Sequence, residues 1–268
     1  MTDCLVDGRP AESVPVDDRG LLYGDHLFET IAVQNGRAPL WKGHWARLVR
    51  GCQMLGLTVP DEQQVLSECL GLSPPDAAVV IRLTLTRGSG GRAYFPLEPP
   101  KCRRIVQVRA WPLGLEQQHS EGLVLVTSPV RMATGSMLAG LKHGNRLEQV
   151  MAARACAQAG ADEALVFDAQ GRLVEGIMSN VIVELGDRVV TPESGSGVDG
   201  VGLAWLRSQP GVDIESVRLD ADDVGSASGI MMINSVAGIR PASQLDDRPL
   251  GISDRCRAWQ QLWKNRII

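Results

Sequence analysis

The sequence predicts an α+β fold in two domains, and three observations support this. Runs rich in strand-forming residues follow one another through hairpin turns. Helical periodicity is confined to a few separate segments. The 268 residues suit one large domain or two smaller ones, with a sizeable core. Strands joined by hairpins, with the helices set apart, favour α+β over a doubly wound sheet.

Turn signals define the strands of the first half. Two dipeptides are of the type that closes a hairpin, namely Asp7-Gly8, between strands at 4–6 and 11–14, and Asn35-Gly36, after a strand at 28–33. Two later runs are rich in β-branched residues, at 77–86 and 104–111.

Apolar residues at helical spacing predict two helices among these strands. One stripe runs from 42 to 56 and consists of Trp45, Leu48, Val49, Cys52 and Leu55. A shorter helix is expected at 62–72. The composition then becomes polar at 112–121. We therefore expect three parts, an N-terminal α+β domain at 1–113, a linker at 114–121 and a C-terminal α+β domain at 122–268.

The second half again mixes strands with isolated helices. Strands are expected at 123–128, 163–168, 173–176, 180–185 and 229–235, those from 163 to 185 as successive antiparallel neighbours. Asn145, with Glu148 three residues on, predicts a helix cap. The helix that follows would end at Gly160 and carry one apolar stripe, formed by Leu147, Val150, Met151 and Ala155. A terminal amphipathic helix is expected at 253–265.

Composition and charge exclude several classes of protein. The net charge is −4, so the basic, clustered footprint of a nucleic-acid-binding protein is missing. No apolar run reaches the roughly 18 residues of a membrane span, and no signal peptide is evident. The six cysteines are dispersed, without metal-ligand spacing. We expect reduced thiols in a cytoplasmic protein with no metal site.

Lysine is rare, and one of the four lysines lies in an unusual context. Lys142 follows a small, apolar run at 137–141, whereas the other three lie in polar, helix-start or chain-end settings. Burial of an ammonium is costly, and a desolvated lysine becomes a nucleophilic amine able to form a Schiff base. The alternative is a lysine whose stem lies along the surface while its amine stays in water.

Other features suit an anionic ligand, and each has an ordinary alternative. The glycine-rich stretch 195–202 offers backbone amides to a phosphate, or is a surface loop. Glu175 ends an apolar strand, where its carboxylate could pair with a protonated ring nitrogen or face water. Arg47 could bind phosphate or be a solvated helix residue. The two arginines of 87–94 could grip an anion, or belong to a plain hairpin tip.

Together these features match what pyridoxal 5'-phosphate (PLP) needs. A lysine binds the aldehyde and a carboxylate keeps the pyridine nitrogen protonated. An arginine, the glycine amides and Asn234-Ser235 at a strand end would hold the phosphate. A Ser-His-Asp set and a Walker phosphate loop are not evident, which argues against a hydrolase and a nucleotide-binding glycine loop.

The chain also resembles a known family over nearly its whole length. The motifs that carry the resemblance lie at 18–25, 28–30, 44–48, 87–94, 141–149, 162–165 and 175–180. They are similar to those of the fold-type IV PLP enzymes, which include branched-chain and D-amino-acid aminotransferases. Within this family, segments 87–94 and 142–149 point to the aminodeoxychorismate lyases. The resemblance implies the two-domain architecture of these enzymes, a cofactor between the domains and a homodimer.

By position, the resemblance assigns roles to residues of both halves. Lys142 matches the Schiff-base lysine and Glu175 the partner of the pyridine nitrogen. The positions that match phosphate ligands are Arg47, Val201, Gly202 and Ser235. The positions that match substrate-facing residues of the lyases are Thr30, Arg92 and Asn234, with Tyr94 expected close by.

Three positions distinguish this chain from its relatives. Leu203 stands where the family loop usually has an arginine, although backbone amides at that loop do not depend on the side chain. Leu147 stands where aminotransferases place a tyrosine against the cofactor, and Thr30 where the branched-chain enzymes often have glycine. The last two differences favour a lyase over a transaminase.

The resemblance implies an enzyme that acts on a small molecule. It would convert 4-amino-4-deoxychorismate to 4-aminobenzoate and pyruvate for folate synthesis. Lys142 would remove the proton from the carbon that bears the substrate nitrogen, Thr30 would protonate the departing group and Arg92 would hold a carboxylate. An aminotransferase on the same scaffold and a non-catalytic dimeric domain that kept the fold are the alternatives.

Overall fold

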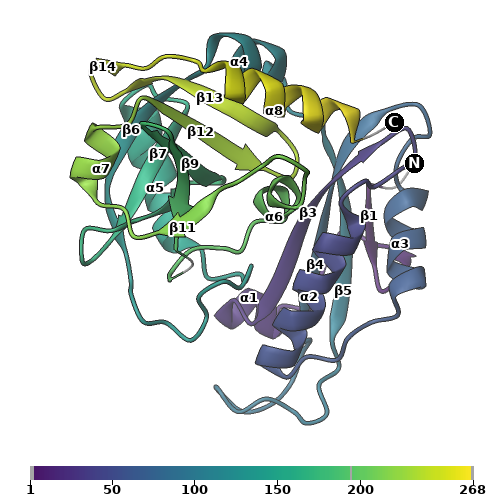
Figure 1. The fold of residues 1–268 in the computed structure, drawn as a ribbon. Helices are drawn as coiled ribbons and strands as arrows, with labels where there is room; N and C mark the ends of the chain where they lie inside the picture. Colours follow the sequence, from purple (N-terminus) through teal and green to yellow (C-terminus); the bar gives the residue numbers. More distant parts are fainter. Residues whose placement is uncertain (1–2, 194, 267–268) are drawn as a thin grey trace. The chain divides into compact units, whose positions relative to one another are not determined.

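The structure, a computed structural model, describes residues 3–193 and 195–266, which form two compact units (Figure 1). The first unit runs to Trp111 and includes Leu141–Asn145, and the second comprises Pro112–Gly140 and Arg146–Arg266. Their mixed helix and sheet content confirms the predicted α+β class. The expected domains follow chain order, so they differ from these units at Leu141–Asn145, which carries Lys142.

Within the described part of the first unit, five strands form an antiparallel sheet in the order β2-β1-β5-β4-β3. These strands are β1 (Cys4–Val6), β2 (Arg9–Pro10), β3 (His26–Gln34), β4 (Ala78–Thr86) and β5 (Arg103–Ala110). Asp7 and Gly8 have φ of 50° and 79°, as a two-residue hairpin turn requires. The prediction of its second strand at 11–14 was wrong, because pairing resumes at once with Val6 opposite Arg9.

Both predicted helices of the first unit are present, as α2 (Trp41–Leu55) and α3 (Glu62–Gly71). They contribute Leu48, Cys52 and Val65 to a core shared with Ile31 and Ile81 of the sheet. The short α1 (Arg19–Tyr23) was missed, because a single turn and a half shows no apolar period. Its N-cap is Asp18, whose side chain accepts a hydrogen bond from the N–H of Gly20.

The sheet of the second unit has nine strands among the described residues, in the order β11-β10-β9-β12-β13-β6-β7-β8, with β14 on β13. They are β6 (Leu123–Met132), β7 (Glu163–Asp168), β8 (Leu173–Gly176), β9 (Asn180–Leu185), β10 (Arg188–Pro192), β11 (Glu215–Val217), β12 (Gly229–Asn234), β13 (Gly238–Leu245) and β14 (Arg248–Pro249). β7 and β8 pair antiparallel as predicted. The prediction that β9 continues this run was wrong, since β9 pairs with β10 and β12. Val181–Glu184 are buried on both faces, which suits a central strand.

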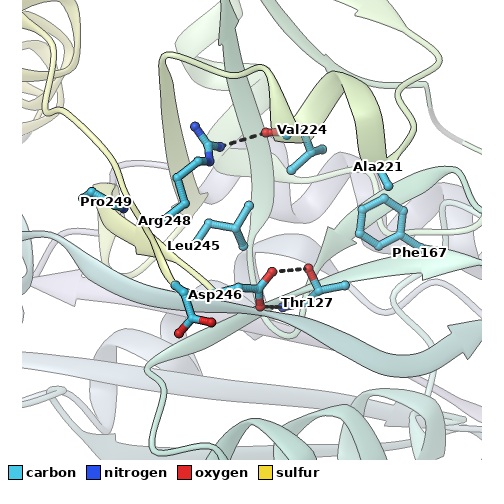
Figure 2. A pocket seen from close by; sticks show the side chains of 10 residues that line it. Thr127, Phe167, Ala221, Val224, Leu245, Asp246, Arg248 and Pro249 are labelled. Carbon is cyan, nitrogen blue, oxygen red and sulfur yellow. Dashed lines mark hydrogen bonds between the residues drawn. The ribbon is translucent and has the colours of Figure 1, made fainter.

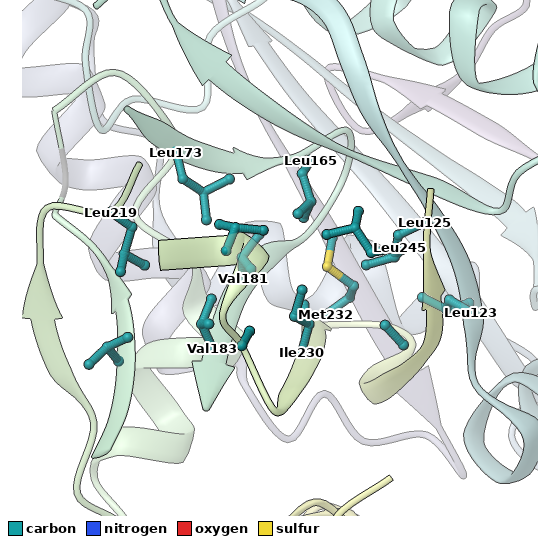
Figure 3. Close-up of a cluster of buried hydrophobic side chains, with 14 of the residues drawn as sticks. Leu123, Leu125, Leu165, Leu173, Val181, Val183, Leu219, Ile230, Met232 and Leu245 are labelled. Atoms are coloured by element: carbon teal, nitrogen blue, oxygen red, sulfur yellow. The ribbon is translucent and has the colours of Figure 1, made fainter. Parts of the chain in front are cut away.

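This sheet curves around its own apolar interior (Figure 3). Leu123, Leu165, Leu173, Val181 and Met232 belong to one cluster of buried side chains. They come from β6, β7, β8, β9 and β12, so strands from distant parts of the sheet order share one core. The interior therefore fixes the ends of β8 and β12, where candidate site residues lie.

Helices flank this sheet. They are α4 (Leu115–Glu121), α5 (Leu147–Gln158), α6 (Val201–Arg207), α7 (Ala221–Gly225) and α8 (Asp254–Asn265). The predicted terminal helix is confirmed, and its Trp263 packs edge-on against Trp205, with ring centroids 5.1 Å apart. α4 occupies the segment expected as a linker. Within the described residues, no helix combines the length and apolar character needed to cross a bilayer.

α5 departs from the sequence prediction in two ways. Its N-cap is Arg146, without a side-chain cap, so the prediction of an Asn145 cap was wrong. Asn145 instead belongs to the first unit and lies against Gly24. The predicted apolar stripe is exposed at Leu147, Val150 and Met151, while the small residues Ala152 and Cys156 face the sheet.

Candidate active site

Lys142 lies on a short segment that pairs with the free edge of β3. The N–H of Phe28 donates to the carbonyl of Lys142 (2.9 Å), and the N–H of Gly144 donates to the carbonyl of His26 (3.0 Å). Because β3 is the last strand in its sheet, its edge has backbone groups available for this pairing. The backbone therefore fixes Lys142 beside Phe28.

The side chain of Lys142 is partly buried against an aromatic ring. Its Nζ lies 4.6 Å from the centroid of the Phe28 ring. Thr30, two residues along β3, shares the face of the strand that carries Phe28. Arg82, which lies opposite Thr30 in the register with β4, places its guanidinium carbon 3.4 Å from the same centroid. Lys142 and Thr30 thus lie on one face, together with a second cation.

Arg82 was not among the residues predicted from the sequence, although the sequence carries a signal for it. A charged residue interrupts the run of β-branched and leucine residues at 78–86, where a strand inside a sheet rarely carries one. Its guanidinium lies over the same Phe28 ring that the amine of Lys142 faces, as a cation–π contact.

Arg47 is held by a buried carboxylate on the opposite face of β3. Its Nε donates to Glu29 Oε1 (2.8 Å) and its Nη2 donates to Oε2 (2.5 Å). His44, one helical turn before Arg47 on α2, donates from Nδ1 to the same Oε2 (2.7 Å). Glu29 is 1% exposed and Arg47 is 6% exposed. The alternative of a solvated helix arginine therefore does not hold for Arg47.

The charges of this cluster are well defined. Burial acts to raise the pKa of Glu29, but the charge and hydrogen bonds of Arg47, with the hydrogen bond of His44, hold it at about 2. Burial lowers the pKa of His44, against the opposing effect of Glu29. Within the described residues, the Nε2 of His44 is buried without a hydrogen-bond partner. A neutral imidazole beside an ionised Glu29–Arg47 pair is the state that these shifts favour.

The two arginines of the glycine-rich segment 87–94 differ in role. Arg87 is buried, binds Asp25 through Nε (2.8 Å) and donates to the carbonyls of Leu55 and Gly56. It therefore anchors the chain and is not available to a ligand. Arg92 is exposed, and the Tyr94 side chain beside it is 80% exposed.

The segment around Arg92 and Tyr94 is tied to α1. Arg19 donates to the carbonyls of Ala93 (2.8 Å) and Tyr94 (3.1 Å), and the rings of Tyr23 and Tyr94 lie 5.4 Å apart. The backbone of this segment is therefore fixed, although its side chains are exposed.

In the second unit, Glu175 is buried at the end of β8. Its Oε2 accepts a hydrogen bond from the N–H of Val198 (2.8 Å), and Gln149 Nε2 lies 3.5 Å from its Oε1. A Cβ on Gly197 would lie 2.8 Å from Oε2, so only glycine permits this close approach. The glycine-rich segment therefore covers Glu175, and the carboxylate does not face open water.

The N-terminus of α6 lies against the end of β12. A Cβ on Gly202 would lie 3.0 Å from the carbonyl carbon of Asn234 and 3.3 Å from the amide nitrogen of Ser235. Four residues predicted from the sequence are therefore neighbours here, namely Val201, Gly202, Asn234 and Ser235. The start of α6 and the end of β12 therefore meet in the second unit.

The side chain of Asn234 serves the turn that follows β12. Its Oδ1 accepts hydrogen bonds from the N–H groups of Val236 (3.0 Å) and Ala237 (2.7 Å), and its Nδ2 donates to Ser179 Oγ (3.2 Å). These bonds fix the backbone at Ser235. The expected role of Asn234 toward a substrate stays a prediction.

A buried ion pair that was not predicted from the sequence supports the turn between Glu175 and Asn180. Arg240 Nη2 lies 3.7 Å from Glu163 Oε1 and donates to Ser179 Oγ (2.9 Å). Glu163 Oε2 accepts from the N–H of Ile177 (2.8 Å). Burial raises the pKa of Glu163 and lowers that of Arg240. Only Glu163 gave a sequence signal, as a member of the motif at 162–165.

The second unit also has a surface pocket of about 690 Å³, which is separate from the candidate site residues (Figure 2). Its floor includes Phe167 and Leu245. Three of its polar residues bind one another or the backbone, since Thr127 donates to Asp246 and Arg248 donates to the carbonyl of Val224. None of the predicted site residues lines this pocket. Across the described residues, no three His, Cys, Asp or Glu side chains are grouped as a metal site would require.

Comparison with known proteins identifies the family. Residues 26–245 match the model of the class IV amino-transferases. The chain belongs to this family. Its members are the fold-type IV enzymes, which depend on PLP.

Some of the similar proteins are named as lyases and others as aminotransferases. The chain is 30% identical over 259 residues to the aminodeoxychorismate lyase of Vibrio harveyi, covering 92% of this chain and 94% of that protein. It is also 30% identical over 257 residues to a putative branched-chain-amino-acid aminotransferase of Methanocaldococcus jannaschii, covering 91% and 86%. The crystal structure of 4-amino-4-deoxychorismate lyase from Pseudomonas aeruginosa has a TM-score of 0.91 and 36% identity, covering 98% of each chain.

The residues of each unit fit the cofactor of this family. In the first unit, the buried guanidinium of Arg47 is ordered by the carboxylate of Glu29, which suits a contact to an anionic group such as a phosphate. At α6, Gly202 leaves the backbone amides of the helix start and of Ser235 uncovered by a Cβ, which suits a phosphate. Lys142 supplies an amine on an apolar surface.

We predict that Gly144→Ala destabilises the first unit by about 1–3 kcal/mol. A Cβ at this position would lie 2.1 Å from Cε1 of His26, whose ring is anchored by the carbonyl of Gly20. Urea unfolding followed by tryptophan fluorescence measures the loss. Gly71→Ala is the control, because it meets nothing within 4 Å on α3 and should be neutral or stabilising. Equal stability of Gly144→Ala and the wild type would contradict the tight packing of Lys142's segment on β3.

We predict that Glu29 stabilises the fold above pH 4.5, and that this contribution disappears as the pH falls from 4.5 to about 2. The contribution has this sign because the pKa of Glu29 in the folded protein, about 2, lies below the ordinary value of 4.5 for a glutamate side chain. The contribution at neutral pH is of the order of 3 kcal/mol. Urea unfolding of wild type and Glu29→Gln at a series of pH values gives the difference. A difference that stays constant down to pH 2 would show that the ionised carboxylate is not its source.

Proposed function

We propose that this protein is an aminodeoxychorismate lyase, which uses PLP to convert 4-amino-4-deoxychorismate to 4-aminobenzoate and pyruvate in folate biosynthesis. The observation that carries the proposal is the amine of Lys142, held against Phe28 on the face of β3 that also carries Thr30. The named lyases at 30% and 36% identity, each covered nearly completely, support the same reaction.

We assign cofactor contacts to residues in each unit. In the first unit, Lys142 provides the attachment amine and Arg47 a phosphate contact. In the second unit, Glu175 pairs with the pyridine nitrogen, and the remaining phosphate contacts come from Val201, Gly202 and Ser235. When bound, PLP supplies an electron sink that stabilises negative charge at the substrate carbon bearing nitrogen.

The remaining chemistry is proton transfer and substrate binding by this chain's own residues. Lys142 removes the proton from the carbon bearing the substrate nitrogen, which makes it the general base. Thr30 returns a proton to the methylene carbon of the departing enolpyruvyl group, which leaves as pyruvate. Arg92 binds a substrate carboxylate, and Tyr94 and Asn234 are further substrate contacts. Formation of the aromatic ring of 4-aminobenzoate drives the elimination.

A second candidate is an aminotransferase on the same fold. The putative branched-chain aminotransferase of M. jannaschii, at 30% identity, favours it. Leu147 argues against it, because the aminotransferases place a tyrosine at this position and Leu147 has no hydroxyl. Its side chain is 78% exposed at the start of α5.

We predict that the purified protein, loaded with PLP, releases pyruvate over many turnovers from 4-amino-4-deoxychorismate without any 2-oxo acid. The pyruvate is measured with lactate dehydrogenase, which reduces it and consumes NADH in proportion. Lys142→Ala should lower the rate by about a thousandfold or more, since it removes both base and attachment amine. Lys101→Ala, at an exposed position, is the control and should keep the wild-type rate.

Two results would contradict the lyase assignment. A transaminase would form product only until its cofactor is converted to the amine form, and would resume when a 2-oxo acid is added. A protein that takes up no PLP and releases no pyruvate would be a non-catalytic member of the fold.

We also propose that the enzyme is a cytoplasmic homodimer. An exposed apolar surface on α1 and the segment after Arg92 would be covered by the second copy. It consists of Leu21, Leu22, Tyr94, Phe95 and Leu97. All six cysteines are free thiols, as suits a reducing compartment.

We predict that Leu21→Lys shifts the protein from dimer toward monomer. The charge would be desolvated at the interface, which opposes association. Sedimentation velocity over a concentration series measures the shift. Leu113→Lys is the matched control, because Leu113 is 94% exposed and lies outside this surface. A wild-type monomer, or equal effects of the two substitutions, would contradict the proposed interface.

A further inference from the structure

Glu29, Arg47 and His44 form a buried cluster in which the carboxylate binds the arginine and the histidine binds the carboxylate. Glu29 engages two different nitrogens of Arg47, at 2.8 Å and 2.5 Å, and so binds the guanidinium in bidentate fashion. His44 donates to the same carboxylate at 2.7 Å. All three side chains are buried. The plane of the Arg47 guanidinium is therefore set by Glu29, and the carboxylate of Glu29 is itself held by His44.

The elements that carry the cluster are rigid. Glu29 lies in the middle of β3, between the core residues Leu27 and Ile31 of the same face. His44 and Arg47 are three residues apart on α2, so they lie on the same side of the helix. A strand and a helix that share one core thus determine the distance between the carboxylate and the guanidinium.

We propose that Glu29 is the positioning residue for the phosphate contact of Arg47, and that His44 holds Glu29 in place for this purpose. The inference rests on the proposed function, because it requires PLP as the ligand. A free arginine side chain samples many rotamers, and ordering it on binding would weaken affinity. Glu29 orders Arg47 in the folded protein before any ligand arrives. The effect is specific to the phosphate, and it leaves the contacts of the pyridine ring unchanged.

A purely structural role for Glu29 predicts something different. Loss of the buried carboxylate would then loosen the first unit as a whole and weaken every contact of the cofactor. The two roles separate when the ligand is varied, because pyridoxal has the same ring and aldehyde as PLP but no phosphate. The ratio of the two affinities reports on the phosphate contact alone.

The experiment measures the dissociation constants of PLP and pyridoxal for the full-length apo protein, by absorbance and tryptophan fluorescence. Glu29→Gln keeps the shape of the side chain and removes its charge. We expect PLP binding to weaken tenfold or more and pyridoxal binding to change less than twofold. Arg47→Ala should give the same selective loss. Inorganic phosphate should compete with PLP less well in Glu29→Gln than in the wild type.

Glu68→Gln is the matched control. Glu68 also binds an arginine in bidentate fashion in the same unit, through Arg104 Nε and Nη2 at 2.6 Å each. Its substitution should leave the ratio of PLP to pyridoxal affinity at the wild-type value. His44→Gln, which keeps the carboxylate, is the second variant should Glu29→Gln fail to fold, and a selective loss of two- to fivefold is expected.

Two outcomes overturn the inference: an unchanged affinity of Glu29→Gln for PLP, or an equal loss for PLP and pyridoxal. Failure of the proposed lyase function has another signature. Wild-type protein would then bind PLP more tightly than pyridoxal, and lose that preference in Glu29→Gln, while it releases no pyruvate from the substrate.

Discussion

Backbone pairing between Leu141–Asn145 and the free edge of β3 is the interaction on which the candidate site depends. Two hydrogen bonds, from Phe28 to Lys142 and from Gly144 to His26, fix this segment on a strand that is otherwise paired on one side only. Gly144 permits the approach, because a side chain there would overlap the ring of His26. The amine of Lys142 therefore meets an aromatic surface on a rigid strand, and this placement follows from backbone geometry.

Opposite faces of β3 serve different purposes. Phe28 and Thr30 belong to the face that Lys142 contacts, while Glu29 lies on the other face and binds Arg47 of α2. Side chains alternate between the two faces of a strand. Residues 28–30 therefore have the amine of Lys142 on one face and the guanidinium of Arg47 on the other. In the second unit, two glycines allow backbone segments to pack closely. Gly197 lies against Glu175, and Gly202 lies against Ser235. Burial of these carboxylates is tolerated because each has a hydrogen-bond donor: Arg47 for Glu29, the N–H of Val198 for Glu175 and the N–H of Ile177 for Glu163.

Local signals were sufficient for much of the fold. Asn35-Gly36 marked a turn, the stripe from Trp45 to Leu55 marked α2, and the apolar surroundings of Lys142 marked its unusual environment. These features depend on neighbours close in the chain, so one sequence contains them. The partners of β9 did not follow in this way, because pairing with β12 joins residues about fifty positions apart.

Long-range packing also explains what was missed in the site. Arg47 had the same sequence signal as a solvated arginine, and only the meeting of α2 with β3 gives it Glu29 as a partner. Arg240 acquires Glu163 and Ser179 through strand pairing that the sequence does not reveal. Leu147 and Val150 belong to the predicted apolar stripe but are exposed, because such a stripe does not show which surface covers it. The roles assigned through family resemblance remain proposals for this chain.

The lysine to which PLP becomes attached can be identified chemically. Reduction of the loaded protein with borohydride makes the link permanent, and peptide mass analysis then assigns it among the four lysines. We expect the pyridoxyl group on Lys142 alone. Attachment at Lys42, Lys101 or Lys264, or no attachment, would contradict it.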